Sequence, residues 1–290
     1  MAVGEELPPR AEAGGQQDAS PRRWSRWTAG LVFEIKRWLP AGLIIAGIIA
    51  LWEWVVATND IPAWKLPAPT AIGSELWTGR ELLLGHTWVT VEEVLIGFAV
   101  ALICGVTLAF LINSSRTLER VIYPGVVASQ TIPIIVIAPL LLIWLGYGLQ
   151  HKVFVVALIS FFPIVVNTVD GLKSADPDMV NLLKTLGANR WQILRKVHVP
   201  SSLPFLFSGI KIAITVSVIG AVIGEWVGSS EGLGYLAIRS KSQFLSERVY
   251  ATVVLLSLMG IVLFLIAGAL ERMLLPWYHN ERRRRTAEDN

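Results

Sequence analysis

Long apolar runs separated by polar segments are the main pattern along the chain. A helix that crosses the hydrocarbon core of a bilayer needs about 20 apolar residues, and several runs approach or exceed that length. Their apolar residues are bunched, whereas an amphipathic helix or strand would space them along one face. The pattern therefore predicts six membrane-spanning helices, at 39–57, 88–112, 126–145, 153–169, 205–227 and 250–269.

The composition agrees with an all-α, polytopic membrane protein. Hydrophobic residues make up 53% of the 290 residues and charged residues only 16%, whereas about a quarter of a soluble domain is charged. Cys104 is the only cysteine, which excludes an intramolecular disulfide and a cysteine cluster for zinc. The basic residues flank apolar runs and form no single patch, so no nucleic-acid partner is expected.

The basic residues also predict the orientation. Most of the 25 Lys and Arg fall before the first run, between the second and third, between the fourth and fifth, and after the sixth. Cytoplasmic segments carry such an excess, so both termini are expected in the cytoplasm. We expect a disordered cytoplasmic tail at 1–38, a transmembrane domain at 39–275 and a basic cytoplasmic tail at 276–290.

The polar segment between the fourth and fifth runs carries signals for two short helices. Asp176 can cap the first helix and Gly187 can end it. Asn189 can cap the second helix and Pro200 would end it, with Ser201 or Ser202 as cap of the fifth span. The apolar positions of this hairpin, 176–200, are Met179, Leu182, Leu183 and Leu186, then Trp191, Leu194 and Val197 or His198.

These apolar positions leave two interpretations open. One stripe can pack on the protein's own membrane helices while the other fits a groove in a partner. Alternatively, both helices lie on the membrane surface.

Two prolines and a group of small residues lie within the predicted spans. Pro133 and Pro139 suit helices that line a pathway, although they also occur in plain structural kinks. Ser217 and Gly220, about one helical turn apart, let helices approach closely. Glu225 follows them, and it faces either the protein interior or pathway, or the outer interface. These five residues, Pro133, Pro139, Ser217, Gly220 and Glu225, are the candidates for a translocation pathway.

The hairpin resembles the "EAA" loop of ABC-transporter permeases, in which Glu-Ala-Ala is followed by three residues, Gly, nine residues and Ile-x-Leu-Pro. Here nine residues separate Gly187 from the segment 197–200, Val-His-Val-Pro, so the spacing matches. Asn181, Leu182 and Leu183 stand where the family has Glu-Ala-Ala. The family's acidic contact therefore cannot be carried over to Asn181.

Other stretches resemble one subgroup of these permeases, the nitrate, sulfonate, taurine and vitamin-precursor importers. They include "LPAPTAI" at 66–72, "QTIPIIVIAPLLLIWLGYG" at 130–148 and "GEWVGSSEGLGYL" at 224–236. The resemblance implies a type I ABC importer permease in a bacterial inner membrane, as a homodimer. A cytoplasmic ATPase and an extracytoplasmic solute-binding protein would be its partners. The ATPase-coupling residues would be Asn181, Leu183, Leu186, Gly187, Arg190, Trp191, Leu194 and Pro200.

The chain has no GxxxxGK[ST] phosphate loop, so ATP and Mg²⁺ would be bound by a separate ATPase chain. Its four histidines are scattered without metal-ligand spacing, and neither a cofactor nor an enzymatic activity is expected. By resemblance the solute is riboflavin or a pyrimidine precursor of thiamine, with sulfonate, taurine or nitrate as the alternative. A secondary transporter that acts alone is the alternative class, and it would predict internal repeats.

Overall fold

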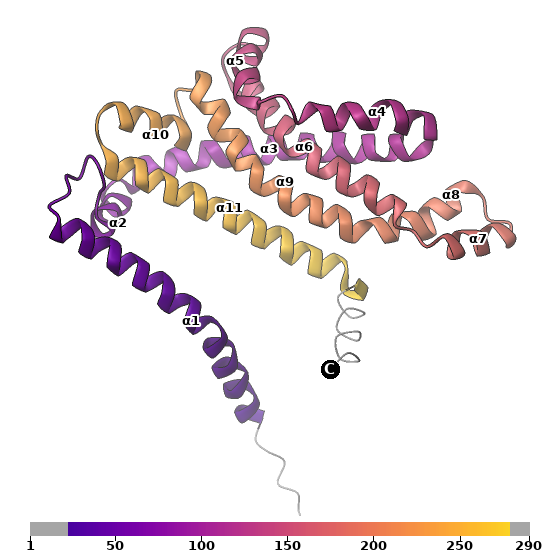
Figure 1. Cartoon of the computed structure of the whole chain (residues 1–290), viewed down its shortest axis with the longest axis horizontal. Helices are drawn as coiled ribbons and strands as arrows, with labels where there is room; N and C mark the ends of the chain where they lie inside the picture. The colour runs from indigo at the N-terminus through magenta and orange to yellow at the C-terminus, as the bar shows by residue number, and fades with distance from the viewer. Residues whose placement is uncertain (1–22, 279–290) are drawn as a thin grey trace, which may run out of the picture. The chain divides into compact units, whose positions relative to one another are not determined.

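The computed structural model describes residues 23–278, with the side chains of residues 39, 40 and 42–278. Every regular element in this part of the chain is a helix (Figure 1). α1 (Arg23–Thr58) belongs for most of its length to one compact unit that ends at Val55. The second unit starts at Val56 and contains α2 (Pro69–Thr78), α3 (Arg80–Ser114), α4 (Arg116–Ser129), α5 (Ile134–Leu145), α6 (Leu149–Lys173), α7 (Pro177–Thr185), α8 (Arg190–Ile193), a π-helical turn (Leu194–His198), α9 (Val199–Gly228), α10 (Leu233–Ser242) and α11 (Ser246–Leu274).

Four described helices are long and apolar enough to cross a membrane. They are α3, α6, the continuous helix Arg190–Gly228 and α11. They contain the predicted second, fourth, fifth and sixth spans, and these four helices are confirmed. A shorter apolar helix, Gly42–Thr58, covers most of the first predicted span. The total of six spans and the cytoplasmic position of both ends stay predictions.

The third predicted span is not one straight helix. α4 and α5 meet at 98° across a short break, so the expectation of a single helix over 126–145 is wrong. Pro133 explains the break, because it has no N–H to donate and disfavours helical geometry at the preceding residue, Ile132.

Helix α1 begins at Arg23, within the segment for which the sequence indicates a disordered tail. The disorder of that tail stays a prediction, and residues 1–22 and 279–290 lie outside the described part.

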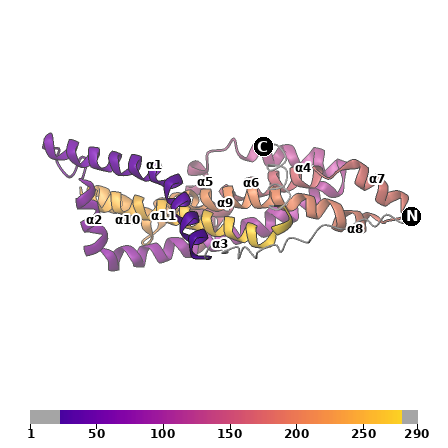
Figure 2. The same cartoon turned by 90° about the horizontal axis from the view of Figure 1, so that it is seen from below.

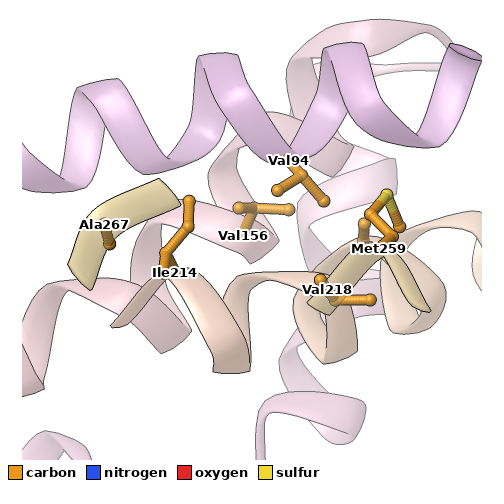
Figure 3. Close-up of a cluster of buried hydrophobic side chains, with 7 residues drawn as sticks. Val94, Val156, Ile214, Val218, Met259 and Ala267 are labelled. Carbon is orange, nitrogen blue, oxygen red and sulfur yellow. The ribbon is translucent and has the colours of Figure 1, made fainter. Parts of the chain in front are cut away.

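Within the second unit, α3, α6, α9 and α11 run side by side. α2 and α10 lie at one end of these helices, and α7 and α8 lie at the other (Figures 1 and 2). A buried cluster joins the four long helices, with Val94 from α3, Val156 from α6, Val218 from α9 and Met259 from α11 (Figure 3). Burial of these side chains holds the four helices together.

Glycines allow α9 to approach α6 closely. A Cβ at Gly220 would lie 2.9 Å from the Cα of Val156, and a Cβ at Gly209 would lie 2.7 Å from the carbonyl oxygen of Pro163. Real Cβ atoms do not come so near, so these positions require glycine. The close approach predicted from the small residues is confirmed at Gly220.

Candidate functional site

The first helix of the hairpin has the predicted ends. The side chain of Asp176 accepts a hydrogen bond from the backbone N–H of Asp178 at 2.8 Å, which caps α7. Gly187 has φ +79°, a left-handed conformation that glycine adopts without steric cost. The backbone N–H of Ala188 reaches back to the carbonyl of Leu183 at 2.9 Å, which closes the end of the helix. The turn at Gly187 therefore sets the angle between the two limbs of the hairpin.

The second helix begins with a reciprocal cap. Asn189 Oδ1 accepts from the N–H of Gln192 at 2.8 Å, and Gln192 Oε1 accepts from the N–H of Asn189 at 2.8 Å. This capping box satisfies two backbone donors that would otherwise lack partners. The predicted cap at Asn189 is confirmed. Its partner Gln192 is a second capping residue, which was not predicted from the sequence.

The expected stop at Pro200 is wrong. The helix that starts at Arg190 runs without interruption to Gly228, through a π-helical turn at Leu194–His198. In this turn the N–H of Val199 bonds to the carbonyl of Leu194, five residues back. A π turn accommodates Pro200, which has no N–H for the ordinary pattern. Ser202 bonds to the carbonyl of Val199 within this helix and caps nothing.

The hairpin leaves large apolar side chains exposed. Leu186 is 73% exposed and Trp191 is 68% exposed, while Ile193 and Val197 on the second limb are buried. His198 donates from Nδ1 to the carbonyl of Leu172 at 2.8 Å, which ties this limb to the end of α6. Of the predicted coupling residues, Leu183 and Leu194 are half-buried, and the exposed ones are Asn181, Leu186, Gly187, Arg190, Trp191 and Pro200.

A groove of about 810 Å³ lies between the hairpin and the end of α3. Phe110 from α3 and Trp191 and Leu194 from the hairpin form its apolar part, and the wall is mostly apolar. Three basic residues also line it, Lys184, Arg190 and Arg195. This end of the unit thus offers exposed apolar surface beside positive charge.

A buried polar cluster lies at the opposite end, around Glu225. This residue is only 1% exposed. Its carboxylate accepts from the hydroxyl of Thr90 at 2.7 Å and from the backbone N–H groups of Gly234 at 2.5 Å and Tyr235 at 3.2 Å. These N–H groups belong to the first turn of α10, where they have no partner within the helix. Glu225 thus joins α9 to α3 and α10.

α3 adds two further bonds to the same turn. The hydroxyl of Thr90 accepts from the N–H of Leu233 at 2.9 Å, and Nδ1 of His86 accepts from the N–H of Gly232 at 2.9 Å. Gly232 has φ +105°, and a Cβ there would overlap the carboxylate of Glu225. The chain therefore enters α10 by a path that only glycine permits.

An ion pair lies in the same region. Lys152 Nζ is 2.5 Å from Glu93 Oε1, and both side chains are almost fully buried. Breaking such a pair leaves an uncompensated buried charge. Thr90, Glu93 and Lys152 were not predicted as site residues from the sequence. Their only sequence signal is a polar residue within or beside an apolar run.

The five pathway candidates are not brought together. Ser217, Gly220 and Glu225 are buried, in contact with the unit's own helices, whereas Pro133 and Pro139 are exposed around the α4–α5 break. A role of these residues in a pathway stays a prediction.

A set of long apolar helices, with an exposed helical hairpin that continues directly into one of them, defines a multi-pass membrane protein. Residues 97–277 match the family described as the binding-protein-dependent transport system inner membrane component. The chain belongs to this family, so it is the permease subunit of an ABC importer in a bacterial plasma membrane.

Three relatives align along most of their length. The formylaminopyrimidine transport permease protein ThiX of Halalkalibacterium halodurans is 40% identical over 231 residues, which cover 79% of this chain and 92% of that protein. The riboflavin transport system permease protein RibX of Chloroflexus aurantiacus is 36% identical over 241 residues, which cover 82% and 89%. The taurine transport system permease protein TauC of Escherichia coli is 27% identical over 243 residues, which cover 81% and 88%.

A solved structure shares the fold. In an inward-facing structure of the MetNI methionine ABC transporter, the matching chain has a TM-score of 0.59 and 20% identity, over 68% of this chain and 97% of that chain. This similarity confirms the type I importer permease fold expected from the sequence.

Proposed function

We propose that the chain forms a homodimer that couples ATP hydrolysis by a separate ATPase to the import of a vitamin or vitamin precursor. The exposed hairpin at 176–200 is the observation that carries this proposal. Its apolar side chains at Leu186 and Trp191 have no cover within the described unit, and basic residues flank them. An apolar helical face of this kind suits a groove in a partner protein.

The continuous helix Arg190–Gly228 gives the hairpin a mechanical connection to the rest of the unit. Closure of two ATPase subunits around ATP and Mg²⁺ would move the paired hairpins together. Because the second limb of the hairpin, α8 and the π turn, continues directly into α9, that movement would also move α9. The pathway between the two copies would then open outward and receive solute from the docked binding protein.

The relatives support a vitamin precursor as solute. The permeases named for formylaminopyrimidine and riboflavin are 40% and 36% identical to this chain, whereas those named for aliphatic sulfonates or taurine are 26–28% identical. Import of a sulfonate, taurine or nitrate is the second candidate, because relatives with sulfonate and taurine names also match over most of the chain.

Co-purification tests the docking role. Trp191→Asp should release the ATPase from the membrane subunit, because it places a charge on the apolar docking face. Trp77→Asp is the matched control, since Trp77 is 71% exposed at the opposite end of the unit and should leave the ATPase bound. Retention of the ATPase by the Trp191 variant would contradict the proposal, and solute flux through the chain alone would favour a secondary transporter.

A further inference from the structure

The break between α4 and α5 lies at the depth of the middle of the membrane. Just before it, Val126 packs in one buried cluster with Ala109 of α3 and Val165 of α6. Just after it, Ala138 packs in another cluster with Val155 of α6. The break therefore lies beside α6 between Val155 and Val165. This part is the middle of α6, which runs from Leu149 to Lys173.

The break is polar and exposed. Ser129, Gln130 and Thr131 are all exposed, and the side-chain amide of Gln130 makes no hydrogen bond to any described residue. The hydroxyls of Ser129 and Thr131 donate to carbonyls of α4, at 2.6 and 2.7 Å, and both can still accept a bond. Irregular backbone exposed to lipid does not occur at this depth, so the break must face protein or a water-filled cavity.

The break itself, residues 130–133, contains no basic residue. On α4 the nearest basic residue is Arg120, nine residues before Ser129, which is about 13 Å along the helix axis. Two lysines inside the spanning helices, one in the first turn of α6 and one within α9, are both paired. Lys152 is 2.5 Å from Glu93, and Lys211 is 2.6 Å from Glu271. An anion that moves through the membrane needs a compensating positive charge, because a bare charge there is costly. A neutral solute needs only hydrogen-bonding partners.

We propose that the α4–α5 break is a solute-contact site in the translocation pathway, where the Gln130 amide and the Thr131 hydroxyl bind a neutral polar solute. The amide supplies two donors and one acceptor oxygen, and the hydroxyl supplies an acceptor. A solute with amide-like edges, such as a neutral heterocycle, matches this set. This inference rests on the proposed importer function and narrows its solute class.

Thiol labelling tests whether the break is in contact with water. Cys104 is the only cysteine, so Cys104→Ser gives a cysteine-free chain in which Gln130→Cys supplies a single thiol. The probe is a cationic, membrane-impermeant methanethiosulfonate, applied to proteoliposomes that contain the complete transporter. We expect the thiol at 130 to react, while the native Cys104, which is exposed on α3 at a similar depth, stays unlabelled.

Three results would overturn the site. One is the absence of labelling at position 130, and another is equal labelling of both thiols. The third is a disulfide between the two copies at position 130 without labelling, which would show that a second copy covers the break. These outcomes do not depend on ATPase binding, so they are distinguishable from a failure of the docking experiment with Trp191→Asp.

Reagents of different charge test the solute class. The rate with neutral 2-hydroxyethyl methanethiosulfonate is compared with that of its anionic 2-sulfonatoethyl analogue, each normalised to a free thiol in solution. Because the break itself contains no cation, the neutral reagent should react at least about tenfold faster. A faster reaction of the sulfonate reagent, or equal rates, would overturn the assignment to a neutral solute.

Discussion

The Thr90 hydroxyl donates a 2.7 Å hydrogen bond to the Glu225 carboxylate, although the two residues are 135 positions apart in the chain. The same carboxylate accepts two backbone N–H groups from the first turn of α10. One buried side chain therefore fixes the relative position of three helices.

Glu225→Ala should loosen α10. The substitution leaves two backbone N–H groups and the Thr90 hydroxyl without their acceptor. Each buried group that stays unpaired lowers the free energy of unfolding by about 1–3 kcal/mol. We expect faster amide hydrogen exchange at 233–235 and a lower Tm in detergent. Glu231→Ala is the control, because the side chain of Glu231 is exposed. Unchanged exchange at 233–235 in the Glu225 variant would contradict the role of this carboxylate.

Removing one partner of the Lys152–Glu93 pair should destabilise the protein strongly. Lys152→Met leaves Glu93 buried beside no cation, and we expect a loss of about 3–5 kcal/mol in the free energy of unfolding. The double variant Lys152→Met, Glu93→Leu should recover most of that loss, since two apolar side chains leave no buried charge without a partner. Thermal unfolding of the purified protein checks both, and additive effects of the two substitutions would contradict the pairing.

The sequence predicts four of the long helices because each is a continuous apolar run, for which length alone is sufficient evidence. It does not predict the break before Pro133, because a proline in an apolar run is equally compatible with a kink inside one span. The same limit applies at Pro200, where a π turn replaces the expected stop.

The buried polar cluster around Glu225 could not be predicted from the sequence, for a different reason. Thr90, Lys152 and Glu225 lie on three helices that are far apart in the chain, and nothing local indicates that they meet. By contrast, the caps at Asp176 and Asn189 depend only on neighbouring residues, and local pattern was enough to predict them.

Gly187→Val should uncouple transport from ATP hydrolysis. Valine is strongly disfavoured at a φ of +79°, so the turn between α7 and α8 should change while the membrane helices stay intact. We expect the loss of solute-stimulated ATPase activity in the complete transporter, with normal insertion of the chain. Asparagine tolerates this conformation, so Gly187→Asn should retain most of the stimulation. Equal stimulation in both variants would contradict a rigid hairpin.

Gly220→Val should separate α9 from α6. The new side chain would collide with the backbone of Val156, and overpacking of this kind costs about 1–3 kcal/mol. Gly260→Val in α11 is the matched control, since no atom lies within 4 Å of a Cβ at that position. Denaturant unfolding in detergent should show a loss only for the first variant, and equal losses would argue against close packing at Gly220.

The uninterrupted helix formed by α8, the π turn and α9 can act as a lever. Its 39 residues, Arg190–Gly228, extend over about 58 Å. It contacts α6 closely at Gly209, midway between its two ends, and this contact can serve as a pivot. A tilt of about 10° would then swing each end by roughly 5 Å in opposite directions. Closing one side of the membrane and opening the other would be a single rigid movement.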